Sequence, residues 1–482
     1  MATFRENTLP LGDLPENLPL RDLFDGQREA FRVGPPDYRK RLNSLDLLRR
    51  TVLGRQDEIA RATDADFGGR ARQETLLLEL APLVDSIRHA TRHLASWMKP
   101  RRVRAGIHFF PATTRIIYQP LGVVGIIGAW NYPTLLTLLP LVDAIAAGNH
   151  VILKPSEIAP RTAELLGQII ASIFPREYIA VVTGDERTAA AFASLPFDHL
   201  LFTGSTRVGK LIMRSASDHL TPVTLELGGK CPAIIHPEFP LRTAVGRIMA
   251  GKLYNAGQTC LAPDYVFAHE SQRDAFVECA REVVKTLYPT WAENFDYTRI
   301  INRAHYDRLA RYVDHAAARG ARVIPLGENT EGCTSTNRVF PPVALLDVDD
   351  TMQVMQEEIF GPILPILTYR RLDDALKYVN DRPHPLAIYY FDYDARRVDH
   401  LLKSTRSGGV TINDVIYHIA QNNLPFGGVG ASGIGQYRGH AGFKTFSKQK
   451  GVMLQSRFTG LRFLRPPYGE LAERAIRFLL RK

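Results

Sequence analysis

Residues 122–153 read GVVGIIGAWNYPTLLTLLPLVDAIAAGNHVIL, and their pattern of apolar runs points to one fold class. Two short runs, Gly122–Ile127 and His150–Leu153, have the length and β-branched composition of buried strands. The segment Leu135–Ala147 between them suits a buried helix better than a membrane span, because prolines and polar residues interrupt it. A strand, a crossover helix and a second strand make one unit of a parallel sheet.

The same alternation continues on both sides of this unit. Towards the amino terminus, residues 20–97 show apolar residues at helical spacing, and a strand is expected at 115–118. Towards the carboxyl terminus we expect helices and strands at 163–173, 179–182, 188–193, 199–202 and 224–227, then a second series to about residue 413, a late strand at 448–457 and a helix at 470–482. The sequence therefore predicts an α/β protein with two parallel-sheet domains.

Composition and charge exclude several classes of protein. The 482 residues include 60 Lys and Arg against 50 Asp and Glu, a net charge of +10. These basic residues are interleaved with acidic ones, so a solvated surface explains the charge better than nucleic-acid binding. The four cysteines form neither a disulfide framework nor a Cys-x-x-Cys pair, so we expect no metal site and a reducing, cytoplasmic location. Residues 1–10 lack the apolar core of a secretory signal.

Cys260 is the candidate nucleophile, at the end of the stretch Tyr254–Cys260 (YNAGQTC). A cysteine reacts as the thiolate, which requires a partly exposed place that stabilises negative charge. The glycine before Cys260 and the Ala-Pro pair after it suit a loop at the edge of a core. A buried structural role is the alternative, and Cys231, Cys279 and Cys333 keep that interpretation.

Two further residues have side chains suited to acyl-transfer chemistry. Glu226 precedes Cys260 by 260 minus 226, or 34, residues and ends an apolar strand beside two glycines. A carboxylate against apolar walls has a raised pKa and can act as a general base near neutral pH. The Asn131 amide and the backbone N–H of Cys260 are two donors suited to an oxyanion. The alternatives are a salt-bridged strand-end glutamate and an asparagine in a turn.

Seven motifs, in this order, resemble those of the aldehyde dehydrogenase superfamily over residues 20–470. They are Asn-Tyr-Pro from Asn131, Lys-Pro-Ser-Glu from Lys154, Phe-Thr-Gly-Ser-Thr from Phe202, Glu-Leu-Gly-Gly-Lys from Glu226, Gly-Gln-Thr-Cys ending at Cys260, Glu-Glu-Ile-Phe-Gly-Pro from Glu357 and Pro-Phe-Gly-Gly from Pro425. The resemblance implies an NAD(P)-binding domain (20–102 and 119–225), a catalytic domain (226–430), oligomerisation strands (103–118 and 447–458) and a tail (459–482).

The resemblance also implies a reaction. An aldehyde would be oxidised to its carboxylic acid through a thiohemiacetal and a thioester on Cys260. Asn131 would bind the oxyanion, and Glu226 would activate the water that hydrolyses the thioester. The branch of the family that transfers the acyl group to coenzyme A usually lacks this glutamate, so Glu226 favours hydrolysis. A coenzyme-A-acylating enzyme and a non-catalytic binding or structural protein are the alternatives, and the intact set of Asn131, Glu226, Cys260 and Glu358 argues against the second.

Two segments are candidates for binding a dinucleotide. Phe202–Gly209 follows a predicted strand and opens a predicted helix, whose N-terminal amides can face a phosphate. Lys154–Glu157 ends a buried strand, where open α/β sheets bind nucleotides. By resemblance, the cofactor-binding residues are Trp130, Lys154, Glu157, Gly204, Ser205, Gly209, Glu358 and Phe360. The carboxylate of Glu157 favours NAD, with NADP as the alternative.

Local features resemble the class 3 branch of the family and, within it, bacterial coniferyl aldehyde dehydrogenases. They include Leu220–Glu226 and Cys260–Tyr265 for the branch, and Pro466–Gly469 for the coniferyl group. The expected substrates are medium-chain or aromatic aldehydes, with Tyr132, Tyr254 and Tyr417 in the substrate pocket; ordinary core packing is the alternative for these aromatics. One departure is Tyr437-Arg438-Gly439, where that branch commonly has Tyr-His-Gly.

The expected partner is a second copy of the chain. The predicted helix 470–482 has Leu471, Ala475 and Leu479 on one face at spacings of four. This apolar run is too short to span a bilayer. Packing on the partner subunit of a homodimer is our interpretation, and weak attachment to an anionic membrane surface through residues such as Arg474 and Lys482 is the alternative.

Overall fold

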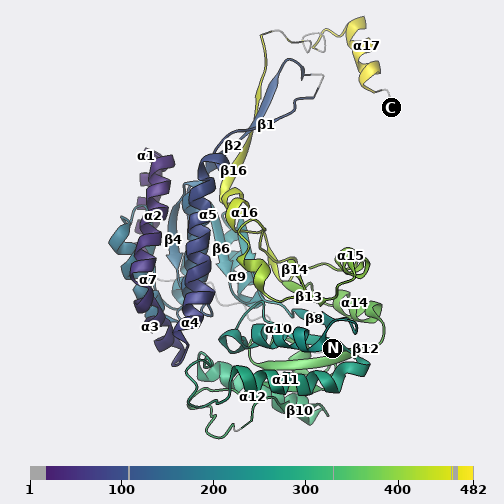
Figure 1. Cartoon of the computed structure of the whole chain (residues 1–482). Helices are drawn as coiled ribbons and strands as arrows, with labels where there is room; N and C mark the ends of the chain where they lie inside the picture. Colours follow the sequence, from purple (N-terminus) through teal and green to yellow (C-terminus); the bar gives the residue numbers. More distant parts are fainter. Residues whose placement is uncertain (1–17, 107–108, 329, 458, 460–464, 481–482) are drawn as a thin grey trace, which may run out of the picture.

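The protein is described by a computed structural model that covers residues 18–106, 109–328, 330–457, 459 and 465–480. Two large sheets, each covered by helices, lie side by side, and a small third sheet projects from the body (Figure 1). The predicted α/β fold with a strand extension is confirmed.

The first large sheet has six strands in the order β15-β7-β6-β3-β4-β5. Their bounds are β3 (Val123–Ile127), β4 (His150–Lys154), β5 (Ile179–Val181), β6 (His199–Thr203), β7 (Val223–Glu226) and β15 (Gly433–Ile434). β3 and β4 are buried along their whole length and pair in parallel, as the 122–153 stretch predicted. The edge strand β15 pairs antiparallel with β7, which the sequence did not predict.

Helices cover both faces of this sheet. They are α1 (Leu18–Val33), α2 (Tyr38–Gly54), α3 (Gln56–Phe67), α4 (Arg72–Thr75), the π-helical turn η1 (Leu76–Leu80), α5 (Ala81–Trp97), α6 (Pro133–Ala147), α7 (Pro160–Ile173), α8 (Glu186–Ala193) and α9 (Thr206–Ser217). The crossover helix α6 is buried at every position. It begins with Pro133, which needs no amide partner in the first turn, and ends at Gly148, whose φ of 92° favours glycine.

The second large sheet has seven strands in the order β10-β11-β12-β9-β8-β13-β14. Their bounds are β8 (Pro232–Ile235), β9 (Tyr265–His269), β10 (Arg322–Pro325), β11 (Val343–Leu346), β12 (Ile363–Tyr369), β13 (Ala387–Phe391) and β14 (Gly409–Ile412). All neighbouring pairs are parallel except β10 with β11 at one edge. Each large sheet therefore carries one antiparallel edge strand, a common addition to parallel sheets.

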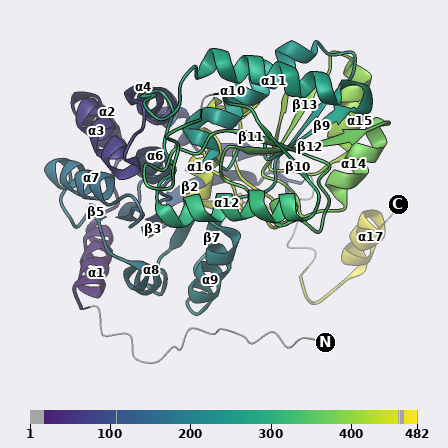
Figure 2. The same cartoon turned by 90° about the horizontal axis from the view of Figure 1, so that it is seen from below.

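The helices of this second unit also form two layers. They are α10 (Leu241–Leu253), η3 (Tyr254–Gly257), η4 (Glu270–Gln272), α11 (Arg273–Leu287), α12 (Arg303–Ala318), α13 (Gln353–Gln356), α14 (Leu372–Asn380), α15 (Ala395–Ser404) and η5 (Tyr417–Ala420). Figure 2 shows α10 and α11 on one side of the sheet and α12 on the other.

The third sheet, hereafter the extension, joins segments far apart in the sequence. β1 (Arg101–Val103), β2 (Thr113–Pro120) and β16 (Ser447–Leu454) pair antiparallel in the order β1-β2-β16. The late strand expected at 448–457 is β16, which follows α16 (Gly439–Thr445). The tail helix α17 (Glu470–Leu479) lies beyond the far end of the extension (Figure 1).

The tail differs in one respect from its prediction. The helix ends at Leu479, and residues 481–482 of the predicted helix lie outside the described residues, as do residues 1–10. Among the described residues, no helix is both long enough and apolar enough to cross a membrane.

Candidate active site

The carboxyl ends of β6 and β7 bring two of the sequence motifs together. Thr203, the last residue of β6, pairs with Glu226, the last residue of β7. Immediately after β6, the Gly204 amide donates to the backbone oxygen of Glu226 over 3.0 Å. The candidate base and the candidate phosphate loop therefore lie side by side at the carboxyl ends of two neighbouring strands of the first sheet.

The side chain of Glu226 is deeply buried. It is only 3% exposed, and neither carboxylate oxygen has a hydrogen-bond partner among the described residues. Burial raises the pKa of Glu226 well above its ordinary value, and the positive charge of Arg438 opposes that rise. The raised pKa agrees with the sequence argument for a base held against apolar walls.

The loop that carries Cys260 begins with three residues in the left-handed region. Asn255, Ala256 and Gly257, in η3, have φ values of 53°, 51° and 75°. For residues with a side chain this conformation costs about 1–3 kcal/mol and persists only where the surroundings impose it. A Cβ on Gly257 would lie 2.4 Å from the Gly361 oxygen, so glycine is needed where the loop meets the Glu-Glu-Ile-Phe-Gly-Pro segment.

Gln258 holds this loop in place. Its amide nitrogen donates to the backbone oxygens of Asn255 and Arg299, each over 3.0 Å, and its amide oxygen accepts from the Ile301 amide over 2.9 Å. The side chain is fully buried, so these bonds satisfy polar groups that water cannot reach. The glutamine of the Gly-Gln-Thr-Cys motif thus positions the cysteine two residues later.

Asn131 and Tyr132 contact the same loop from the end of β3. The Asn131 side-chain nitrogen donates to the Gln258 backbone oxygen over 3.1 Å, and the Tyr132 hydroxyl bonds the Thr259 hydroxyl over 2.7 Å. In return, the Asn255 side chain donates to the Asn131 backbone oxygen over 3.0 Å. The structure therefore brings the predicted oxyanion donor into contact with the loop that carries the predicted nucleophile, although the two residues are 129 positions apart (260 minus 131).

The environment of Cys260 differs from the expectation in its charge. The side chain is partly exposed, as expected. Burial of the sulfur and the nearby carboxyl groups of Glu358 and Glu226, however, raise the pKa of the thiol to about 12. The protein groups therefore disfavour the thiolate, because burial and two acids outweigh the hydrogen bonds from the amides of Cys260 and Leu261.

Glu358 and Phe360 lie across from the Glu-Leu-Gly-Gly-Lys motif. A Cβ on Gly228 would lie 1.9 Å from a Glu358 carboxylate oxygen, so this glycine makes room for the acid. Burial, followed by the charge of Asp264, raises the pKa of Glu358 to about 8. Phe360 has a φ of 51° and packs edge-on against Trp130, with 5.3 Å between ring centroids.

The remaining predicted cofactor residues lie on the first sheet. The Lys154 ammonium, at the end of β4, pairs with the Glu157 carboxylate over 2.8 Å. Ser205 caps α9, where its hydroxyl accepts from the Val208 amide over 3.4 Å, and a Cβ on Gly209 would lie 2.6 Å from Leu227. Within the part of the chain that the structure describes, Thr203 Oγ1 and Glu358 Oε1 have no hydrogen-bond partner, and together with this helix start they fit the polar groups of a dinucleotide.

Comparisons with known proteins agree with these motifs. The model of the aldehyde dehydrogenase family matches residues 27–452. The chain belongs to the aldehyde dehydrogenase family. It is 48% identical over 95% of both chains to a protein of Pseudomonas aeruginosa named "Probable coniferyl aldehyde dehydrogenase", and 42% identical to aldehyde dehydrogenase family 3 member A2 of Mus musculus, over 89% of this chain and 87% of that one.

A solved structure shows the same fold. The substrate-bound state of Staphylococcus aureus AldH superposes with a TM-score of 0.90 at 36% identity, and the match covers 95% of this chain and 99% of that one. The two relatives named above confirm the predicted resemblance to the class 3 branch and to its coniferyl aldehyde dehydrogenases. The protein is an NAD(P)-dependent aldehyde dehydrogenase that oxidises an aldehyde to a carboxylic acid.

Two of the predicted substrate-pocket residues contact each other and line a small pocket. The Tyr254 and Tyr417 hydroxyls are 3.1 Å apart, although 163 residues separate them in the sequence. They line a pocket of about 180 Å³ with Arg247, Asp414 and Val415, among others. Tyr132 does not line this pocket, because its hydroxyl turns towards Thr259.

Sequence reasoning missed several charged residues that shape the aldehyde dehydrogenase site. Lys230 binds the Asp264 carboxylate and the backbone oxygens of Val354 and Glu357, the latter two over 2.8 and 2.9 Å. Asp264 in turn accepts from the Ile359 amide over 3.0 Å, which connects three motifs. The sequence did offer one sign of this role: Lys230 and Asp264 are charged residues within motifs made mainly of apolar residues and glycine.

A second missed group, from residues 70–79, supports the Cys260 loop. Glu74 accepts from the Asn255 amide over 2.9 Å, and the Arg70 guanidinium donates to the Asn131 backbone oxygen over 3.1 Å. Arg70 also pairs with the buried carboxylate of Glu79 over 3.3 Å. A buried arginine with its acids was not predictable from helical spacing alone, because charged residues are usually exposed.

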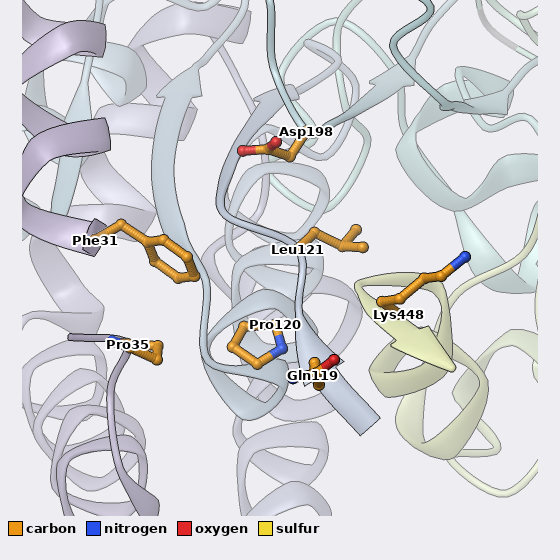
Figure 3. Close-up of a pocket in the computed structure, with 7 residues that line it drawn as sticks. All are labelled: Phe31, Pro35, Gln119, Pro120, Leu121, Asp198 and Lys448. Carbon is orange, nitrogen blue, oxygen red and sulfur yellow. The ribbon is translucent and has the colours of Figure 1, made fainter. Parts of the chain in front are cut away.

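An open pocket of about 470 Å³ lies elsewhere (Figure 3). It is lined by Phe31, Pro35, Gln119, Pro120, Leu121, Asp198 and Lys448, near the base of the extension. None of the predicted site residues lines it. Among the described residues, no cluster of three or more His, Cys, Asp or Glu side chains is arranged to hold a metal ion.

Proposed function

We propose that Cys260, Glu226 and Asn131 carry the chemistry of this aldehyde dehydrogenase. The observation that supports it is their convergence: β3, β7 and the loop after η3 bring them to one place from distant parts of the sequence. Cys260 adds to the aldehyde carbon, and the Asn131 amide with the Cys260 N–H binds the resulting oxyanion. A nicotinamide held by the proposed cofactor residues would supply the hydride acceptor.

Glu226 serves the second half of this reaction. Once the hydride has left, the acyl group is a thioester on Cys260. The Glu226 carboxylate takes a proton from a water molecule, the hydroxide adds to the acyl carbon, and the C–S bond breaks to release the acid and the thiolate. The presence of this base supports hydrolysis of the thioester rather than transfer of the acyl group to coenzyme A.

The cofactor we propose is NAD, with NADP as the alternative. Lys154 and Glu157 would bind the adenosine ribose, Gly204, Ser205 and Gly209 the phosphates, and Trp130, Glu358 and Phe360 the nicotinamide half. The Glu157 carboxylate disfavours the 2′-phosphate of NADP, but its ion pair with Lys154 reduces that repulsion.

The substrates we propose are aromatic aldehydes with a phenolic hydroxyl, such as coniferyl aldehyde. The name of the Pseudomonas aeruginosa relative supports this class. The Tyr254–Tyr417 pair supports it independently, because two hydroxyls that line one pocket offer hydrogen-bond partners to the phenol of a flat substrate. Medium-chain aldehydes are the alternative class.

We also propose that the protein is a cytoplasmic homodimer. The exposed apolar side chains of α17 and the extension supply a surface for the second subunit. Leu471, Phe478 and Met453, for example, are 59%, 67% and 45% exposed.

The purified protein with NAD and coniferyl aldehyde tests this function. We expect one equivalent of carboxylic acid per NADH without coenzyme A, and a higher kcat/KM for coniferyl aldehyde than for hexanal. The Tyr417→Phe variant should lower kcat/KM for coniferyl aldehyde more than for cinnamaldehyde, which lacks the phenol. A dependence of product formation on coenzyme A, or equal losses for both aldehydes, would contradict the corresponding part of the proposal.

A further inference from the structure

The turn between α3 and α4 brings a buried arginine to the residue proposed as the oxyanion donor. Gly68 and Gly69, with φ values of 65° and 145°, follow α3, and the Arg70 amide donates to the Asp64 carboxylate over 2.8 Å. The Arg70 side chain is fully buried, and its Nη1 atom donates to the Asn131 backbone oxygen over 3.1 Å. The turn is thus anchored on α3, and its guanidinium is bonded to the loop that follows β3.

Two aromatic rings also contact the Arg70 guanidinium. Its Cζ atom lies 5.0 Å from the ring centroid of Phe67 and 5.0 Å from that of Tyr132. A cation within about 6 Å of a ring centroid is attracted by the negative face of the ring. Arg70 therefore contacts two successive residues of the same loop, the backbone oxygen of Asn131 and the ring of Tyr132.

Two buried acids balance the charge of Arg70 and connect it to α6. The Nη1 atom lies 3.3 Å from one Glu79 oxygen, and Nε lies 4.0 Å from a Glu74 oxygen. The other Glu79 oxygen accepts from the Thr134 and Leu135 amides over 2.9 and 3.1 Å. The residue at the N-cap of α6 makes no side-chain bond to this first turn, so Glu79 satisfies amides that would otherwise need another partner.

The π-helical turn η1 explains how one arginine reaches both acids. Glu74 and Glu79 are five positions apart (79 minus 74), a spacing that in an α-helix turns two side chains about 140° away from each other. The wider turn Leu76–Leu80 begins after Glu74 and contains Glu79, and both carboxylates lie within 4.0 Å of the guanidinium. Such π-helical turns are frequent at functional sites.

Two side chains fix the backbone of Asn131 while its own side chain stays available. The Asn131 backbone oxygen accepts from Arg70 and from the Asn255 side chain, the latter over 3.0 Å. The side-chain nitrogen donates to the Gln258 backbone oxygen over 3.1 Å. Because a primary amide has two N–H groups, the second can donate to an oxyanion on the adduct of Cys260. Its direction depends on how the Asn131 backbone is held.

We propose that Arg70 is a positioning residue for the oxyanion site, because it fixes the Asn131–Tyr132 peptide next to the donor amide. The inference rests on the proposed role of Asn131 as oxyanion donor. Such a donor is effective when it is aimed before the carbonyl adds, so a small rotation of this peptide slows the addition. A lysine keeps the charge but lacks the planar fork and the ring stacking, so it should not replace Arg70.

The rate of the NADH burst measures this role, because hydride transfer follows the addition of Cys260 to the aldehyde. With cinnamaldehyde and saturating NAD in a stopped-flow apparatus, Arg70→Lys should slow the burst by about 10- to 100-fold, less than the ~10²- to 10³-fold cost of removing an oxyanion donor outright. In an Asn131→Ala background the same substitution should change the rate by less than about twofold, because the donor that it positions is gone.

Two further measurements separate positioning from general loosening. Alkylation of Cys260 by iodoacetamide displaces iodide at a saturated carbon and forms no oxyanion, so Arg70→Lys should keep its rate within about twofold. Arg41→Lys is the matched control: this buried arginine donates to the Ala146 backbone oxygen over 3.1 Å at the other end of α6. It should lower the melting temperature to a similar extent and leave the burst unchanged.

A second variant covers the case in which Arg70→Lys does not fold. The double variant Arg70→Met with Glu79→Gln removes the buried cation together with one of its acids, and the glutamine keeps an acceptor for the first-turn amides of α6. It should slow the burst by about 10- to 100-fold and lose that effect in the Asn131→Ala background.

The outcomes keep the two proposals apart. A wild-type burst in Arg70→Lys, an equal slowing in Arg41→Lys, an equal slowing of alkylation, or a full effect of Arg70→Lys in the Asn131→Ala background would overturn the role of Arg70 alone. A wild-type burst rate in Asn131→Ala would instead show that Asn131 is not the oxyanion donor, and the role of Arg70 would fall with it.

Discussion

The Cys260 loop and the extension keep their shapes by opposite means. The loop has irregular backbone, three successive left-handed residues and buried side chains that satisfy it, with Gln258 alone making three hydrogen bonds. The extension has a regular ladder, in which β16 pairs with β2 over eight residues while most of its side chains are exposed. The proposed reactive groups therefore lie where side chains fix the backbone, whereas the extension leaves most of the β16 side chains exposed.

The nucleophile is the most sensitive point of this comparison. Cys260→Ala should lower aldehyde oxidation by at least about 10⁴-fold, because no other group forms the covalent adduct. Binding of NAD, measured by titration calorimetry, should stay within a factor of about three, since the loop keeps its hydrogen bonds through Gln258. Cys231→Ala is the matched control, a buried cysteine whose thiol donates to the Cys260 backbone oxygen over 3.4 Å.

The base comes second in expected effect. Glu226→Gln should give a burst of NADH close to one equivalent, followed by turnover slower by about 10²- to 10⁴-fold, the usual contribution of a general base. The acyl-enzyme should accumulate and be visible by mass spectrometry. The control is Glu157→Gln, which removes a different carboxylate, one that follows β4 of the same sheet. Normal steady-state turnover in Glu226→Gln would show that another group activates the water.

The sequence predicted the regular helices and strands better than the irregular segments. The strands and helices of 122–153 follow from apolar periodicity, and the candidate chemistry followed from motifs. The two-residue strand Gly433–Ile434 has no periodicity to detect, although it pairs with the end of β7 that carries Glu226. The burial of Arg438 and Arg70 was also unpredictable, because a charged residue is expected at the surface until its partners are known.

The effect of Glu358 on the thiol gives a smaller and pH-dependent prediction. The pKa of Cys260 is raised to about 12 by burial and then by Glu358, whose own pKa is about 8. In the enzyme without cofactor, alkylation of Cys260 by iodoacetamide should therefore rise steadily with pH to at least 9, as the thiolate fraction grows.

Glu358→Gln tests which acid restrains the thiol. At pH 9, where Glu358 is mostly ionised, the substitution should speed labelling of Cys260 by about tenfold, one pKa unit, and at pH 6.5 it should have little effect. Labelling is read by peptide mapping, which separates Cys260 from the other three cysteines. Glu357→Gln is the control, because the neighbouring carboxylate bonds the Tyr312 hydroxyl instead. Equal acceleration in both variants would mean that the loop has loosened.

The smallest expected effect concerns the tail helix α17, whose side chains, like those of the extension, are mostly exposed. In α17, Leu471 and Phe478 are 59% and 67% exposed in a single chain, so they can gain burial only from a second surface. Replacing both with serine should weaken the dimer by about tenfold, or ~1.4 kcal/mol, in analytical ultracentrifugation. The control Arg474→Gln with Arg477→Gln alters the charged residues and should leave the dimer unchanged. If the charge variant instead abolishes sedimentation with anionic vesicles while the dimer persists in both, α17 contacts a membrane surface rather than a partner subunit.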